Sequence, residues 1–212
     1  MAKSKIGVNM KKVDIKKQLS AFYKASPKDV RDVDVPKTDF LMIDGRGDPN
    51  TAPEYAEAVT ALYQLAYAIK FHIKKSKKAI DYGVLPLEGL WWVDDMRRFS
   101  TEDKSSWKWT MMIRQPEFVT REIVEAMRAE VAEKKAPPAL PNIRFGSYRE
   151  GKSAQILHIG PYSAEGPNIA KLHDHIQQSG HALRGKHHEI YLKDPRKSAP
   201  EKLKTILRQP YG

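Results

Sequence analysis

The chain has 212 residues, of which 41% are hydrophobic and 30% are charged, and it contains no cysteine. This composition is typical of a globular protein with one ample core, and it excludes disulfides, thiolate metal sites and a cysteine nucleophile. The N-terminal residues 1–10 carry lysines but no apolar segment of the kind found in signal peptides, and no stretch is apolar enough to span a membrane. We therefore expect a cytoplasmic protein.

The net charge of +11 raises the possibility of nucleic-acid binding. The basic residues gather in three places: residues 1–38, the segment 74–78, and the tail around residues 196–204. Lysine outnumbers arginine in the first two, and neither alternates basic with aromatic residues as single-strand binders do. Zinc-finger and RNA-recognition signatures are also missing from the sequence. Solvated lysine surfaces are the favoured interpretation, with nucleic-acid binding as a third class of function behind the two described below.

The first part of the chain predicts an N-terminal extension followed by a strand and a long helix. Residues 1–37 are basic and polar, with one short helix expected from Ile15 to Tyr23. A strand from Thr38 to Gly45 precedes the helix, whose start at Thr51-Ala-Pro-Glu54 resembles a capping box. Large apolar side chains recur every four residues along this helix, so we expect them to face an apolar partner. They are Tyr55, Val59, Tyr63, Tyr67 and Phe71, with Leu62, Ala66 and Ile69 alongside.

The remaining elements alternate between strands and helices. Expected strands are residues 84–93, 107–114, 154–159, 186–193 and 203–208, and a charged connection, residues 94–106, separates the first two. Helices are expected over residues 120–134 and 164–179, the second with Gly180 as its C-cap. This alternation predicts an α+β fold.

Two parts of the chain resemble each other. Each contains a lone glutamate within an apolar strand, Glu88 and Glu189, and each ends in the tripeptide Arg-Gln-Pro, at residues 114–116 and 208–210. The pattern suggests a duplicated strand-helix-strand-strand unit, with repeat one at 38–116, a linking helical segment at 117–142 and repeat two at 143–212.

The two glutamates are the first candidates for chemistry. Alternate side chains of a strand share a face, which groups Glu88 with Trp92 and Glu189 with His187 and Tyr191. If the repeats pair, both glutamates can line one cleft of aromatic residues, as small-molecule sites require. The alternative is that each glutamate lies on a solvated sheet face. Whether Trp91 or Trp92 faces the cleft is open, because a β-bulge at Gly89 would exchange them.

Three segments carry a family resemblance. The second half, with His158-Ile-Gly-Pro-Tyr162 and Glu189-Ile-Tyr-Leu-Lys-Asp-Pro195, resembles the GyrI-like small-molecule-binding domain, and Pro86-Leu-Glu-Gly-Leu-Trp-Trp92 is similar to its stand-alone branch. The resemblance covers about residues 38–212. It implies duplicated SHS2-type units with a ligand cleft between them, multidrug binding without cofactors, and a central acidic residue at Glu189. Residues 1–37 are too short for a helix-turn-helix domain, so a transcription activator is not expected.

Some stand-alone members of this family are hydrolases that detoxify DNA-alkylating natural products by opening their cyclopropane rings. For such a reaction Glu189, its pKa raised by aromatic walls, would deprotonate water. Tyr67 would donate a proton to the developing phenolate, and Glu88 would be a second polar anchor or a neighbour that raises the pKa of Glu189. The expected ligand is a planar apolar or cationic small molecule, held by Tyr63, Trp91, Trp92, Trp109, Tyr162 and Tyr191.

Simpler interpretations remain open. The tyrosines of the long helix can be core residues with satisfied hydroxyls, and Trp107 and Trp109 can be strand core. The histidines at 187–188 and at 173 and 175 have near-ligand spacing, but no third ligand obviously joins them, so we expect no metal. The competing function is a non-catalytic protein that sequesters drugs or modulates a partner such as gyrase.

Overall fold

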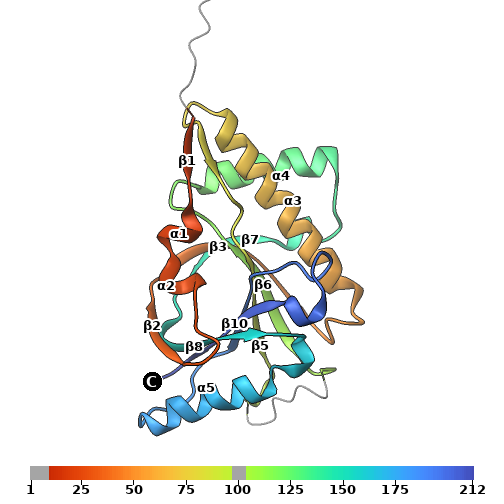
Figure 1. Ribbon diagram of the computed structural model, residues 1–212. Coiled ribbons are helices and arrows are strands. Elements are labelled where there is room, and N and C mark those ends of the chain that lie inside the picture. The colour runs from red at the N-terminus through yellow and green to blue at the C-terminus, as the bar shows by residue number, and fades with distance from the viewer. Residues whose placement is uncertain (1–9, 97–103) are drawn as a thin grey trace, which may run out of the picture.

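An eight-stranded antiparallel sheet forms the centre of the computed structural model, which describes residues 10–96 and 104–212 (Figure 1). Part of the expected 94–106 connection lies outside the described residues. The strand order is β2-β8-β10-β9-β5-β6-β3-β7. A separate two-stranded sheet pairs β1 (Lys11–Val13) with β4 (Ile80–Tyr82) in parallel. The main-sheet strands are β2 (Arg31–Val35), β3 (Thr38–Arg46), β5 (Leu87–Trp92), β6 (Lys108–Arg114), β7 (Arg144–Tyr148), β8 (Gly151–Ile159), β9 (His187–Tyr191) and β10 (Lys204–Pro210).

Five α-helices accompany the sheet in the described ranges, and the α+β prediction is confirmed. They are α1 (Ile15–Gln18), α2 (Ser20–Tyr23), α3 (Pro53–Lys75), α4 (Arg121–Lys134) and α5 (Gly166–Gln178), with short 3-10 turns η2 (Leu140–Asn142), η3 (Tyr162–Ala164) and η4 (Pro200–Lys202). The single helix expected from Ile15 to Tyr23 is wrong: the chain forms two separate turns that meet at Leu19, which has neither helical nor extended dihedral angles.

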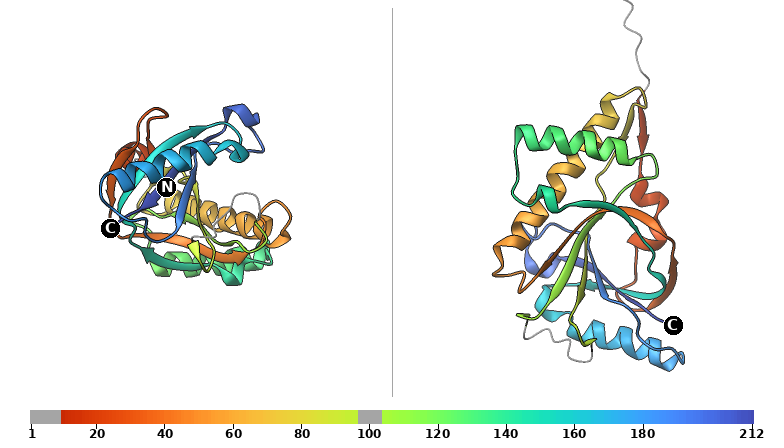
Figure 2. Two further views of the ribbon diagram at one scale, coloured as in Figure 1. Left: turned by 90° about the horizontal axis from the view of Figure 1, so that it is seen from below. Right: turned by 180° about the vertical axis from the view of Figure 1, so that it is seen from behind.

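The strand order reads symmetrically from its centre, the β9–β5 pair. Outward from this centre, β9, β10 and β8 on one side are equivalent to β5, β6 and β3 on the other. The outermost strands cross over: β2, which precedes the first half in the sequence, lies beside β8, and β7, which precedes the second half, lies beside β3. Only residues 36–37 separate β2 from β3, and only residues 149–150 separate β7 from β8. Because each short link joins strands at opposite ends of the order, the sheet must curl until its ends meet, as Figure 2 shows.

The concave face of this curl closes over a small polar interior. Side chains from both ends and from the middle of the sheet converge on one cavity of about 10 Å³. That volume is about the size needed for a single water molecule. Its lining includes Val35, Phe40, Glu88, Arg114, Tyr148, Glu150, His188 and Arg208.

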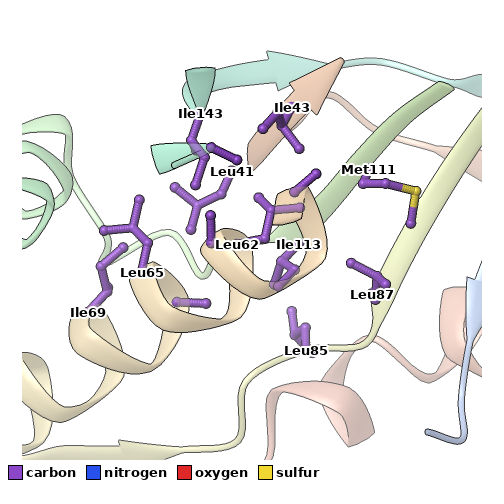
Figure 3. Close-up of a cluster of buried hydrophobic side chains, with 14 of the residues drawn as sticks. Leu41, Ile43, Leu62, Leu65, Ile69, Leu85, Leu87, Met111, Ile113 and Ile143 are labelled. Carbon is purple, nitrogen blue, oxygen red and sulfur yellow. The ribbon is translucent and has the colours of Figure 1, made fainter. Parts of the chain in front are cut away.

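Helices cover the convex face in two places. The inner side of α3 packs its leucines and isoleucines on β3 and β6, the apolar core that Figure 3 shows. At the other end of the sheet, Leu172 and Ile176 of α5 contact the strand residues Ala154, Ile156 and Leu207. Both helices lie on one side because β-strand alternation places small and branched apolar residues there. The convex face between the two helices carries the middle strands β9 and β5.

Two expectations about α3 are corrected. The helix begins at Pro53 and its N-cap is Ala52, which has no side-chain acceptor, so Thr51 does not form a capping box. The predicted aromatic stripe of α3 is also only partly correct: Tyr55, Val59 and Tyr63 pack against the core, but its outer end does not. Tyr67 and Phe71 are each 46% exposed, because the helix turns 100° per residue and packs a neighbouring set inward. That buried set is Ala58, Ala61, Leu62, Leu65, Ala66, Ile69 and Ile73.

The segment before residue 38 takes part in the sheet. The strand β2 pairs with β8 over five residues, from Arg31 opposite Gln155 to Val35 opposite Gly151. Gln155 also donates from Nε2 to the carbonyl oxygens of Ala21 and Lys24. These bonds attach α2 and the following residues to the concave face, so the N-terminal segment closes the interior of the curled sheet.

Candidate functional site

Glu189 lies in the middle of the sheet on its convex face, directly opposite Gly89 in the β5–β9 pair. The residue is only 8% exposed. The hydroxyl of Tyr191 donates a hydrogen bond to Oε2 at 2.7 Å, and Nε2 of His187 lies 3.5 Å from Oε1. The three side chains share a face because they alternate along one strand, as the sequence predicts. The result is a nearly buried carboxylate with one firmly bound donor.

Aromatic side chains from three other elements surround this carboxylate. Trp91 donates from Nε1 to the Tyr191 hydroxyl at 3.1 Å, and the Tyr162 ring meets the Tyr191 ring edge-on with centroids 5.6 Å apart. Tyr55, in the first turn of α3, contacts Trp91 at 6.0 Å and Trp109 at 5.4 Å between centroids. Such aromatic arrangements stabilise the site. Trp91 and Trp109 are buried within it, and Tyr55, Tyr162 and Tyr191 are partly exposed.

Both tyrosines that approach Glu189 from the helices keep their protons at neutral pH. Burial first, and then the charge of Glu189, raise the pKa of Tyr55 well above its ordinary value. The same two causes raise the pKa of Tyr162 to about 12. A neutral phenol is a hydrogen-bond donor, so the site contains proton donors beside a carboxylate.

A second carboxyl group, Glu165, lies near Glu189 and was not predicted from the sequence. It immediately precedes α5 and is 4% exposed. Burial, and then the charge of Glu189, raise its pKa to about 9, against a smaller lowering by Thr205. Glu165 is therefore a neutral carboxylic acid at pH 7. The only sequence signal was its place three residues after the Gly160-Pro-Tyr162 turn.

Gly89 makes the Trp91–Tyr191 hydrogen bond possible. A Cβ at this position would lie 2.8 Å from Nε1 of Trp91 and 3.1 Å from the Tyr191 hydroxyl. We expect Gly89→Ala to lower the free energy of unfolding by about 1–3 kcal/mol, since overpacking forces side chains from their rotamers. Urea unfolding measures this. The matched control is Gly83→Ala, where an added Cβ meets nothing within 4 Å; an equal effect of both substitutions would contradict the steric argument.

Glu88 does not share the Glu189 face, which corrects the expectation of one cleft lined by both glutamates. In the β5–β9 register Glu88 lies opposite Ile190, while Glu189 lies opposite Gly89. Directly paired residues of antiparallel strands point to the same side, so the two glutamates point to opposite sides of the sheet. Glu88 instead lines the concave interior, where the Tyr23 hydroxyl donates to Oε1 at 2.6 Å.

The concave interior holds a buried charge network around Glu88. Nε2 of His188 lies 3.0 Å from Oε2 of Glu88, and its Nδ1 lies 2.9 Å from Oε1 of Glu150. Arg208 donates to Oε2 of Glu150 at 3.1 Å. Burial alone would raise the pKa of Glu150, but His188 and Arg208 lower it to about 2. Burial likewise opposes the charge of His188, yet Glu150 and Glu88 raise its pKa to about 9. Glu150 and His188 are thus both ionised at neutral pH.

The other predicted ligand-binding residues separate into two groups. Trp91, Trp109, Tyr162 and Tyr191 surround Glu189, and Tyr63 lies close enough to contribute to the raised pKa of Tyr162. Trp92 points to the concave side, where the ammonium of Lys186 lies 3.2 Å from its ring centroid. Between the two tryptophans, the register assigns Trp91 to the Glu189 face.

Tyr67 lies outside the group of aromatic side chains that surrounds Glu189. It stacks between Tyr63 and Phe71, with centroids 6.3 Å from each. Its side chain lines a groove of about 450 Å³ between α3 and α4. The structure therefore places the predicted proton donor beyond Tyr63, whereas Tyr55 and Tyr162 are the tyrosines of α3 and η3 whose pKa responds to Glu189.

Residues 10–96 and 104–212 contain no cluster of three or more histidine or carboxylate side chains arranged to hold a metal ion. None of the helices in these ranges combines the length and apolar character that a membrane crossing requires.

Comparison with known proteins gives consistent results. A family model described as the GyrI-like small molecule binding domain matches residues 28–211. An uncharacterized conserved protein from Listeria innocua is 38% identical, with a TM-score of 0.87 over 94% of this chain and 100% of that one. A structure described as a hydrolase from the same organism is 37% identical, with a TM-score of 0.81 over 94% and 100% of the two chains. A second Listeria innocua hydrolase structure is 38% identical, with a TM-score of 0.84 over 95% and 100%. Among curated proteins, no significant match is found.

Proposed function

Because this chain belongs to the GyrI-like small-molecule-binding domain family, we propose that it is a hydrolase that opens cyclopropane rings of planar, electrophilic small molecules. The ligand lies beside Glu189, in a cleft between two duplicated strand-helix-strand-strand units. One observation carries the proposal: a nearly buried carboxylate is held by Tyr191 within a ring of aromatic side chains. The description of two similar Listeria innocua proteins as hydrolases supports a reaction rather than binding alone.

The reaction is an addition of water to a cyclopropane fused to a dienone. Glu189 accepts a proton from water as the water oxygen forms a bond to a ring carbon. The breaking carbon–carbon bond delivers its electron pair into the dienone, which becomes aromatic, and the carbonyl oxygen becomes a phenolate. The rings of Tyr55 and Tyr162, which are only partly buried, orient the planar substrate, and Trp91 supports them from beneath.

The developing phenolate requires a proton donor. Tyr55 and Tyr162 are better placed for this role than Tyr67, because both interact with Glu189 and both remain protonated at neutral pH. Tyr67, 46% exposed and one helical turn beyond Tyr63, is retained as a contact for a substrate that extends along α3. Glu88, on the concave side of the sheet, supports the strand that carries Trp91 and does not meet the substrate.

The test is hydrolysis of a spiro-cyclopropane dienone by the wild-type protein and by Glu189→Gln. We expect the substitution to slow turnover by about 10²–10⁴-fold, which is the range for loss of a general base. Glutamine keeps the size of the side chain and can still accept from Tyr191, so the fold is retained. Glu201→Gln, at an exposed position, is the matched control and should leave the rate unchanged.

Two results would contradict the proposal in different ways. Equal rates of hydrolysis by the wild type and by Glu189→Gln would show that Glu189 is not the general base. Binding of the dienone by the wild type without turnover would identify a sequestering protein, the competing function.

A further inference from the structure

The groove of about 450 Å³ between α3 and α4 is separate from the Glu189 site. The two helices cross and pack against each other, as Figure 1 shows. Among the described residues, those that line the groove include none of the aromatic side chains that surround Glu189. Small-molecule sites have volumes of about 300–1,000 Å³, so the groove is large enough for a ligand of its own.

Two exposed aromatic rings form part of the groove. Tyr67 and Phe71 lie one helical turn apart on α3, and their rings stack with an interplanar angle of 26°. Both are exposed, and neighbouring exposed rings make a patch of the kind that marks binding grooves. Met127 and Val131 of α4 line the same groove and are buried. The groove therefore combines flat aromatic rings with an aliphatic surface, which suits a planar aromatic ligand.

The groove is positively charged where the two helices end. The helix α3 ends at Lys75 and α4 ends at Lys134, and both lysines line the groove together with Lys135. The only carboxylate of the described lining is Glu130, which Lys134 contacts at 2.6 Å. The hydrogen bond from Lys134 lowers the pKa of Glu130 most, and the charges of His72 and Lys75 on α3 lower it further. The basic ends of both helices thus lie close together, and three lysines against one glutamate leave a surplus of positive charge.

Gln64 contributes a polar group at the other end of the groove. Its Oε1 atom is buried and has no hydrogen-bond partner among the described residues. A buried acceptor without a donor is unfavourable, and a hydroxyl group of a ligand would satisfy it. Residues 64–75 span about 16 Å of helix, so this acceptor and Lys75 lie far enough apart to contact opposite ends of one ligand.

We propose that this groove is a second small-molecule site, which binds planar aromatic carboxylates that carry a hydroxyl group at the opposite end of the ring system. The carboxylate lies between Lys75 and Lys135, and the rings lie against Tyr67 and Phe71. The hydroxyl donates a hydrogen bond to Oε1 of Gln64. Like-charge repulsion disfavours the same ligand beside Glu189, so the two sites select ligands of different charge. This inference does not depend on hydrolysis.

The experiment compares three probes that share a naphthalene ring system. They are hydroxynaphthoate with its two substituents at opposite ends, naphthoate without the hydroxyl, and the neutral amide of hydroxynaphthoate. In calorimetric titrations of the wild-type protein we expect hydroxynaphthoate to bind most tightly. Loss of the hydroxyl should weaken binding by about 2–10-fold. Loss of the charge should weaken it by about 2–10-fold at low salt, and this second difference should shrink as salt rises to about 0.5 M.

Two double variants test the part played by the lysines. Lys75→Gln/Lys135→Gln should lose the preference for hydroxynaphthoate over its amide, while the amide binds as it does to the wild type. The matched control, Lys202→Gln/Lys204→Gln, removes the same charge from exposed positions outside the groove and should keep the preference. A preference that persists in the first variant, or that disappears equally in the control, would overturn the proposal.

Amide NMR spectra of the wild-type protein locate the ligand without any substitution. Addition of hydroxynaphthoate should shift the resonances of residues 64–75 in α3 and 127–134 in α4. Shifts confined to β5 and β9 would place the ligand beside Glu189 and overturn the proposal. Failure of hydroxynaphthoate to bind would overturn it as well, and binding of an acidic peptide in its place would identify the groove as a docking surface for protein. Hydrolysis can fail or succeed independently, because none of the probes contains a cyclopropane.

Discussion

Replacing Arg208 by methionine is expected to destabilise the fold by about 3–5 kcal/mol, because it removes one of the two cationic partners of the buried Glu150 carboxylate and leaves buried acceptors without a donor. Arg208 is 2% exposed. Its guanidinium donates to Glu150 at 3.1 Å, to Oε1 of Gln155 at 2.8 and 3.0 Å, and to the carbonyl oxygen of Phe22 at 2.7 Å. The substitution therefore weakens the sheet interior and the attachment of α2 together.

Urea unfolding measures the change in stability, and amide hydrogen exchange locates it. We expect faster exchange at Ser20–Tyr23 in Arg208→Met than in the wild type, because the Phe22 carbonyl loses its donor. The matched control is Arg196→Met. Arg196 also pairs with a carboxylate, Asp194, but its side chain is 72% exposed, so the expected loss is only about 0–1 kcal/mol. Similar losses for the two variants would show that the interior network does not hold the fold together.

Stability is expected to fall as the pH rises from about 6.5 to 9, because of His188. Its pKa in the folded protein is about 9, above the ordinary value of 6.5. The folded state thus binds a proton more strongly than the unfolded chain does. The resulting stabilisation is complete below about pH 6.5 and is lost as the pH rises through about 9. In acid the sign reverses: Glu150 has a lowered pKa of about 2, so its contribution is lost as the pH falls from about 4.5 toward 2.

Urea midpoints measured from pH 5 to 10 check this window. The variant His188→Gln should be less stable than the wild type at pH 6, and its midpoint should fall less steeply than that of the wild type between about pH 6.5 and 9. The fall that remains is the contribution of Glu165, whose raised pKa acts in the same direction. His181→Gln, at an exposed position, keeps the network and should reproduce the wild-type pH dependence. An unchanged slope in His188→Gln would assign the alkaline loss to another group.

Most of the elements could be predicted from the sequence, because apolar periodicity reports on the faces of single helices and strands. The face shared by Glu189, His187 and Tyr191 followed from strand alternation alone. The relation between Glu88 and Glu189 could not be obtained in this way, since it depends on the register between two strands. One residue of shift in register reverses which side chains share a face. The internal likeness of the two halves suggested equivalent positions, but Glu88 lies opposite Ile190 and points to the other side.

The charge network and Glu165 were missed for a different reason. Polar residues in a sequence are most often exposed, so nothing in the chain marked Glu150, His188 and Arg208 as interior. One signal was available. The repeated Arg-Gln-Pro places Arg114 and Arg208 against the same small cavity, and Gln115 and Gln209 each bond to nearby backbone carbonyls. The tripeptide therefore reflects shared packing in β6 and β10 rather than chemistry.

The position of β10 in the sheet affects how the chain folds during synthesis. β10 is the last strand in the sequence, yet it lies between β8 and β9 and pairs with both. Until the ribosome releases residues 204–210, a nascent chain has two unpaired strand edges facing each other. Such edges bind other strands readily. Residues 204–210 thus complete the sheet, and truncated chains that lack them expose both edges to aggregation.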